Sequence, residues 1–193
     1  MRRPSAIVVA IAAGAVVRGA LLLTTQVVAI DGITYIDQAR MMVAGRLADA
    51  LAMPFPPGYP AAIAALHTLL GMPATAAGWE LSGQLASLLA GVLLVPAVYA
   101  LTREVLRDTK APIESVALIA AVLCAFQPQL AKYATQVRSE SVYFLFFTLG
   151  LLFAIRTVRN RSPADPALAA LSIVLAYLVR PEAILLVPLL GAW

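Results

Sequence analysis

The side chains of this sequence that could do chemistry are a few acids and arginines at the ends of long apolar segments. Asp31 directly follows the first apolar segment. Arg138 and Glu140 flank a serine, and Arg180 and Glu182 flank a proline. Carboxylates serve as general bases, and guanidinium groups bind anions through paired N–H donors. If the fold brings these three parts of the chain to one face, they form a candidate site.

The elements that must position these residues are apolar. Of 193 residues, 62% are hydrophobic and 12% are charged, and the mean hydropathy is +0.89. A soluble domain carries about twice that charged fraction, so the sequence predicts an all-α, polytopic membrane helix bundle. The net charge is +4 without a basic block, which argues against nucleic-acid binding. A single cysteine, Cys124, excludes an internal disulfide and a cysteine-based metal cluster.

Six apolar segments are predicted to span the membrane within a single transmembrane domain: 5–30, 81–101, 113–127, 141–156, 167–179 and 183–193. The first is interpreted as an uncleaved anchor, because it is too long for a signal peptide and carries Arg18. The last reaches Trp193 while still apolar. We therefore expect the sequence to be the N-terminal part of a longer protein.

The loop 31–78 is predicted to lie on the outer face with two surface helices, at about 34–47 and 60–71. The apolar stretch Tyr59–Gly71 is flanked by prolines, and a helix of that length is too short to cross a bilayer. If it does not cross, eight basic residues fall inside and five outside, in agreement with the positive-inside rule. The acids at 31, 140 and 182 then share the extracytoplasmic face. The eight are Arg2, Arg3, Arg103, Arg107, Lys110, Arg156, Arg159 and Arg161, and the five are Arg40, Arg46, Lys132, Arg138 and Arg180.

An ordered set of short motifs resembles the opening of GT-C glycosyltransferases, most closely the protein O-mannosyltransferase and aminoarabinose-transferase group. The resemblance covers roughly residues 16–190. Two departures stand out: many relatives have Asp-Glu where this chain has Asp31-Gly32, and Pro-Pro-Leu at the proline motif. The motifs are Asp31 with Tyr35, Gly45-Arg46-Leu47, Pro56-Pro57-Gly58-Tyr59-Pro60, Arg138-Ser139-Glu140-Ser141 and Arg180-Pro181-Glu182-Ala183.

The resemblance implies a glycosyltransferase of the plasma (inner) membrane that moves a hexose or pentose from a polyprenyl-phosphate donor, with inversion, on the extracytoplasmic face. The acceptor is a protein, lipid or glycan. Asp31 is then the general base, and Arg138 and Arg180 bind the leaving phosphate. Further substrate-binding candidates are Tyr35, Tyr59, Glu140 and Glu182. The resemblance implies no particular cofactor, and a divalent metal held with the help of Glu140 stays open.

Each assignment competes with a structural interpretation. Asp31 could belong to an Asp-Gly turn, Glu140 could cap a helix, and the arginines could reach toward headgroups. Arg18 is interpreted as a structural contact between helices, and His67 as a packing residue. Two other functions remain open: a secondary transporter with substrate at the broken helix near Arg180, and a non-catalytic scaffold.

Overall fold

The computed structural model describes residues 5–25, 30–159 and 162–186, and all regular structure within these ranges is helical. The predicted all-α bundle is therefore confirmed. In chain order the elements are α1 (Ala6–Thr24), α2 (Ile30–Val43), α3 (Leu47–Leu51), α4 (Gly58–Leu69), α5 (Ala76–Leu106), α6 (Ile113–Phe126), α7 (Pro128–Thr135), α8 (Glu140–Val158), α9 (Asp165–Val179) and the 3-10 helix η1 (Pro181–Leu185).

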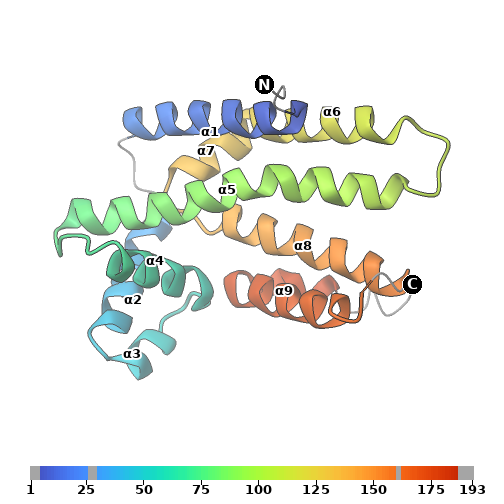
Figure 1. The fold of residues 1–193 in the computed structure, drawn as a ribbon. Coiled ribbons are helices and arrows are strands. Elements are labelled where there is room, and N and C mark those ends of the chain that lie inside the picture. The colour runs from blue at the N-terminus through green and yellow to red at the C-terminus, as the bar shows by residue number, and fades with distance from the viewer. Residues whose placement is uncertain (1–4, 26–29, 160–161, 187–193) are drawn as a thin grey trace.

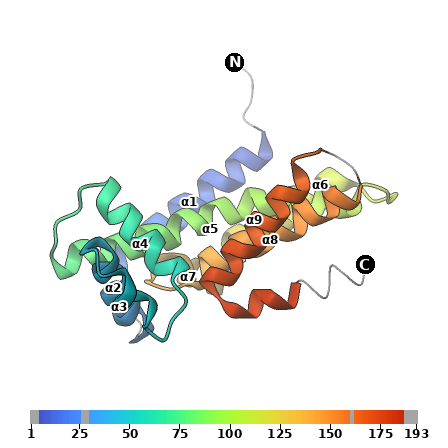
Figure 2. The same cartoon turned by 90° about the horizontal axis from the view of Figure 1, so that it is seen from below.

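The long helices lie side by side, and the short helices α2, α3 and α4 gather at one end of them (Figures 1 and 2). Helix α5 is central, because it packs against α1, α4, α6, α7 and α8. Helix α9 packs along α8 and also reaches α4. One end of the bundle is thus built by α2, α4, the start of α8 and the end of α9.

Among the described residues, three helices are long and apolar enough to cross a membrane: α1, α5 and α8. Helices α6 and α7 make a fourth span if the pair, bent by 53°, is counted as one. The chain is therefore a multi-pass membrane protein. Helix α9 has 15 residues, and most of the predicted last span lies outside the described residues, so the prediction of six spans stays a prediction. Helix α4 has only 12 residues, or about 18 Å of helix.

The break between α6 and α7 explains the arginine inside the first span. Pro128 has no N–H group, so it cannot continue the hydrogen bonds of α6. The side chain of Arg18 is fully buried and donates to the carbonyl oxygens of Ala125 and Cys124, at 2.6 and 3.0 Å. These carbonyls lie in the last turn of α6, where partners are missing. Arg18 is the structural contact that the sequence predicted.

Glycines follow the ends of two helices in the segment 31–78, α2 and α4. Gly45 and Gly71 have φ values of 74° and 58°, a left-handed conformation that favours glycine. Helix α2 therefore stops at Val43 rather than at the expected residue 47. It also starts at Ile30, earlier than expected, so Asp31 lies in the first turn of a helix and not in a turn between elements.

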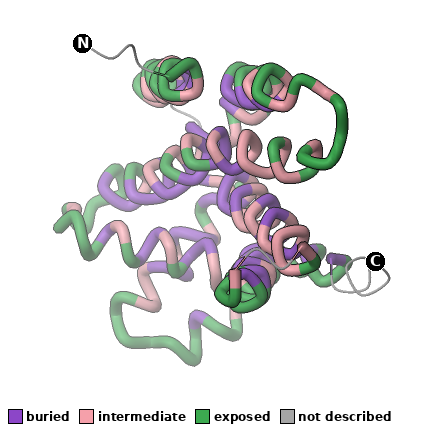
Figure 3. The backbone as a smooth tube through the Cα atoms, turned by 45° about the vertical axis from the view of Figure 1, so that its right-hand side comes forward, coloured by how far each residue is buried: buried purple, intermediate pink, exposed green. Residues whose placement is uncertain are grey.

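Burial follows the packing of the bundle. Figure 3 shows buried residues where α5 meets its neighbours and exposed residues on the outward sides of the helices. Many of the outward residues are apolar, among them Val16, Leu23, Ile119, Leu123 and Leu171. In a soluble protein such a surface would be unusual, whereas a helix that faces lipid tails requires it.

Candidate functional site

A cavity of about 340 Å³ lies at the end of the bundle where α2, the start of α8 and the end of α9 meet. We call it the Asp31 pocket. Six of the seven site residues predicted from the sequence line it, although they come from three distant parts of the chain. These six are Asp31, Tyr35, Arg138, Glu140, Arg180 and Glu182, and the wall also includes Phe55, Pro56 and Ser139.

Glu140 joins the two arginines of the pocket. One of its carboxylate oxygens lies 3.4 Å from an amino nitrogen of Arg138 and 3.4 Å from one of Arg180. The Glu140 side chain is only 16% exposed, so this bridge is better shielded from water than a surface ion pair. The carboxylate thus fixes two guanidinium groups from separate loops beside one cavity.

Asp31 has no such partner. Its side chain is exposed on the pocket wall and forms no ion pair or hydrogen bond with any residue in the described ranges. Tyr35 stands one helical turn further along α2 and therefore shares its face. Of the acids in the pocket, Asp31 is the one whose oxygens are free to accept a proton from a substrate.

The side chain of Glu182 is 57% exposed, much more than that of Glu140. Its backbone N–H and then the Arg180 side chain, 3.3 Å away, lower the pKa of Glu182. Burial alone would lower the pKa of Arg180, but the hydrogen bond from Arg180 to Glu182 and the charges of Glu182 and Glu140 raise it overall. Arg180 therefore stays cationic.

Tyr35 forms the buried side of the pocket. Its ring lies 4.8 Å from that of Phe55 and meets the ring of Tyr59 edge-on at 5.0 Å. Its hydroxyl donates to Ser139 Oγ at 3.2 Å. Burial raises the pKa of Tyr35 above its ordinary value, so the hydroxyl stays protonated and keeps this bond.

Tyr59, the seventh predicted residue, lies behind the wall rather than on it. It is fully buried, and its hydroxyl lies 2.8 Å from Ser87 Oγ and 3.0 Å from the carbonyl oxygen of Gly83. Tyr59 donates to the Gly83 carbonyl oxygen, and Ser87 donates to the carbonyl oxygen of Arg138 at 2.9 Å. Either hydroxyl can be the donor in the contact between Tyr59 and Ser87. This chain of hydroxyls ties the backbone of Arg138 to α4 and α5.

Two glycines allow the close packing that places the arginines. A Cβ atom on Gly58 would lie 2.6 Å from the carbonyl oxygen of Leu178, two residues before Arg180. A Cβ atom on Gly83 would lie 2.8 Å from a methyl group of Val137, next to Arg138. The glycine in the Pro-Pro-Gly-Tyr motif thus permits the start of α4 to touch the end of α9.

Sequence reasoning missed Ser87, Ser139, Gly58 and Gly83. Small residues at buried helix contacts are common in membrane helices, so their types alone gave no signal for a site. The structure shows what they do for the two arginines. Ser139 lies next to Arg138, and Ser87 bonds the Arg138 carbonyl oxygen. Gly83 and Gly58 leave room for the residues just before Arg138 and Arg180.

A second cavity of about 380 Å³ adjoins the Asp31 pocket and shares Glu140, Arg180 and Glu182 with it. Its other walls are aromatic: Tyr133, Tyr143 and Phe144. Arg138 lies over the ring of Tyr133 at 5.2 Å and Arg180 over that of Tyr143 at 5.9 Å, which are cation–π distances. Within the described ranges, no three metal-ligating acids, histidines or cysteines gather.

The fold and the pocket define a class: a multi-pass helical membrane protein with a carboxylate and two arginines converging at one end of the bundle. The chain matches, over residues 54–193, the family model described as dolichyl-phosphate-mannose-protein mannosyltransferase, and it belongs to that family. The resemblance to GT-C glycosyltransferases is confirmed, and the chain is a membrane glycosyltransferase of the mannosyltransferase type. Asp31 and Tyr35 precede the matched range. No curated protein and no solved structure matches the chain.

Proposed function

We propose that the Asp31 pocket transfers a sugar from a polyprenyl-phosphate donor to an acceptor hydroxyl, with inversion at the anomeric carbon. The observation that carries the proposal is that an unpaired, exposed carboxylate shares one cavity with two arginines held by a single glutamate. A cavity of about 340 Å³ falls in the usual size range for small-molecule sites.

The chemistry assigns the two kinds of charge different tasks. As the acceptor oxygen attacks the anomeric carbon, Asp31 takes the proton of its hydroxyl group. The bond between that carbon and the donor phosphate oxygen breaks, and the electron pair leaves with the lipid phosphate. Arg138 and Arg180 stabilise the negative charge that grows on this phosphate.

The remaining residues position the reactants in this proposal. Glu140 holds both arginines, and Tyr35 and Glu182 contact the sugar from opposite sides of the pocket. Tyr59 acts through Ser87 on the backbone of Arg138, rather than by touching substrate. A divalent ion beside Glu140 is not required, because the two arginines already supply the positive charge that the leaving group needs.

The active face is proposed to be extracytoplasmic and the membrane the plasma membrane. The ends of α5 and α8 that lie opposite the Asp31 pocket carry Arg103, Arg107, Arg156 and Arg159, which the positive-inside rule places in the cytoplasm. A transporter would hold its substrate near the midplane. The Asp31 pocket lies instead at the start of α8, which supports the enzyme over the transporter.

The test is the Asp31→Asn substitution in the full-length protein, assayed in membranes with a polyprenyl-phosphate mannose donor and a mixture of acceptor classes. We expect a fall in turnover of about 10²–10⁴-fold, the usual contribution of a general base. Asp49→Asn is the matched control, because Asp49 is an exposed acid of the same loop whose side chain faces Arg46 at 3.9 Å. Full activity of Asp31→Asn would exclude Asp31 as the base.

A further inference from the structure

A second charged cavity lies at the opposite end of α5 and α8 from the Asp31 pocket. Its volume is about 780 Å³, and we call it the Arg107 cavity. Ser87, beside the Asp31 pocket, and Arg103, on the cavity wall, are 16 positions apart on α5, or about 24 Å of helix. The two sites are therefore separated by most of the thickness of a bilayer core. The residues used below are Arg103, Arg107, Glu114, Ser115 and Arg156.

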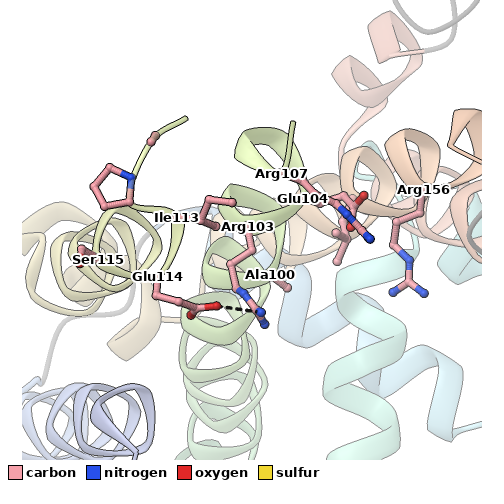
Figure 4. A pocket seen from close by; sticks show the side chains of 11 residues that line it. Ala100, Arg103, Glu104, Arg107, Ile113, Glu114, Ser115 and Arg156 are labelled. Atoms are coloured by element: carbon pink, nitrogen blue, oxygen red, sulfur yellow. Dashed lines mark ion pairs between the residues drawn. The ribbon is translucent and has the colours of Figure 1, made fainter. Parts of the chain in front are cut away.

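The cavity gathers arginines from two helices. Arg103 and Arg107 stand one turn apart on α5, and Arg156 lies in the last turn of α8. Figure 4 shows Arg103 beside Glu114 at the start of α6, joined by their ion pair, with Arg107 on α5 and Arg156 on the other side of that helix. Guanidinium groups from separate helices that line one cavity are the usual arrangement for holding an oxyanion.

These arginines are only loosely committed to carboxylates. The ion pair between Arg103 and Glu114 is 2.8 Å long, but both side chains are more than half exposed, at 51% and 64%, so it contributes little stability and opens readily. Arg156 meets buried Asp165 through Nε alone, at 3.2 Å, which leaves its two terminal amino groups for another partner. Arg107 is exposed and has no ion pair within the described ranges.

The start of α6 adds backbone donors to the same cavity. Its N-cap residue is Pro112, which provides no side-chain cap. The N–H groups of the first turn therefore lack helical partners, and the residues that carry them, including Glu114 and Ser115, line the cavity. The Ser115 hydroxyl is a further donor. A helix start of this kind favours a negatively charged ligand.

The surroundings identify the source of the anion. The cavity lies where the apolar stretches of α5 and α8 end, and nearby exposed side chains on α5 and α6 are apolar, including Val105 and Ile119. A soluble phosphate ester would gain nothing from these apolar neighbours, whereas a phospholipid places its phosphate at this depth and its acyl chains along the helices. We propose that the Arg107 cavity binds the phosphate group of a membrane phospholipid headgroup.

The test uses single variants of the full-length protein, each purified in an uncharged detergent. Native mass spectrometry then measures how much phosphatidylglycerol each variant retains. We expect Arg107→Gln to weaken retention by about five- to tenfold, because it removes a charge-assisted contact to phosphate. Arg107→Lys keeps part of the binding, as a point charge without the fork geometry. Arg46→Gln is the control: it removes the same charge from an exposed arginine of the outer loop and leaves retention unchanged.

A second variant gives an effect of the opposite sign, which misfolding cannot imitate. Glu114→Gln removes the carboxylate that competes for Arg103, so retention of phosphatidylglycerol rises. Two results would overturn the proposal: equal losses in Arg107→Gln and Arg46→Gln, or no increase in Glu114→Gln. Complete displacement of the lipid by an equal concentration of glycerol 3-phosphate would exclude the phospholipid as the ligand, because the acyl chains would then contribute nothing.

Discussion

The two ends of α5 and α8 carry opposite arrangements of charge. In the Asp31 pocket the arginines are held by a shielded glutamate and an acid, Asp31, is left unpaired. In the Arg107 cavity the acids are engaged and a cation, Arg107, is left without an ion pair among the described residues. Both ends hold arginines and carboxylates, so composition alone does not separate them.

The unpaired group indicates what each end can do. A free carboxylate beside anchored cations suits proton removal next to a leaving phosphate. A free guanidinium group beside weak, exposed ion pairs suits binding of an anion without chemistry. Changes at the first end should therefore affect turnover, whereas changes at the second should affect lipid binding or stability.

After Asp31→Asn, the largest effect is expected from Glu140→Gln, which removes the carboxylate shared by Arg138 and Arg180. Without it the two guanidinium groups repel each other and lose their fixed positions, and a misplacement of about 1 Å costs on the order of 10²-fold in rate. We expect turnover to fall by about that factor, measured with the same donor assay as for Asp31→Asn. Glu114→Gln is the comparison, because Glu114 pairs with a single arginine, Arg103, outside the Asp31 pocket and is 64% exposed.

Equal effects of Glu140→Gln and Glu114→Gln on turnover would show that the bridge has no special role. Arg138 and Arg180 would then act independently. In that case the comparison between the two ends of the bundle would lose its main support.

The sequence predicted much of this pocket because its charges interrupt apolar segments. Asp31, Arg138 and Arg180 could be assigned to one face from hydropathy and the positive-inside rule alone. The fold class followed from the same pattern. Helix ends followed less well: the sequence placed a surface helix at 34–47, whereas Gly45 ends α2 at Val43 and leaves a short α3.

The supporting residues could not be predicted, for a physical reason. Tyr59 was a substrate-binding candidate, but it is fully buried and its hydroxyl bonds Ser87. A tyrosine near an interface has the same local sequence whether it points to substrate or into a helix contact. The close approach of α4 to α9 at Gly58 decides which way the Tyr59 side chain points. Such packing between distant helices cannot be predicted from the local sequence.

The next effect in size is expected at the other end of the bundle, from Asp165→Asn. The Asp165 side chain is 1% exposed, and Arg156 Nε lies 3.2 Å from one of its oxygens. Arg156 itself is 36% exposed, so losing the pair costs less than for a fully buried one, about 1–3 kcal/mol of unfolding free energy. Denaturation in detergent would measure it, and turnover of the folded fraction should stay within about twofold, a change worth under 0.5 kcal/mol.

Asp49→Asn again serves as the control, because its ion pair is exposed on both sides, at 58% and 62%. Its loss should change the unfolding free energy by no more than about 1 kcal/mol. A large drop in turnover for Asp165→Asn would contradict the separation of chemistry and structure between the two ends.

The smallest effect is expected from Tyr59→Phe, and it tests whether the buried hydroxyl chain positions Arg138. Burial raises the pKa of Tyr59, so its hydroxyl stays protonated and keeps its hydrogen bond with Ser87 Oγ, 2.8 Å away. Removing it costs about 1 kcal/mol, the net value of one hydrogen bond. If the hydroxyls of Tyr59 and Ser87 position Arg138, turnover also falls several-fold, which corresponds to about 1 kcal/mol on the activation barrier. The KM for the donor then stays the same.

Ser87→Ala and the double variant decide between packing and positioning. Ser87 donates to the carbonyl oxygen of Arg138, so its removal cuts the same chain at the next link. Because the two hydroxyls act in series on one backbone group, the double variant should lose little more turnover than Ser87→Ala alone, whereas independent contacts would add. Additive losses in turnover would mean that Tyr59 and Ser87 only fill the core, and that Glu140 alone fixes the arginine.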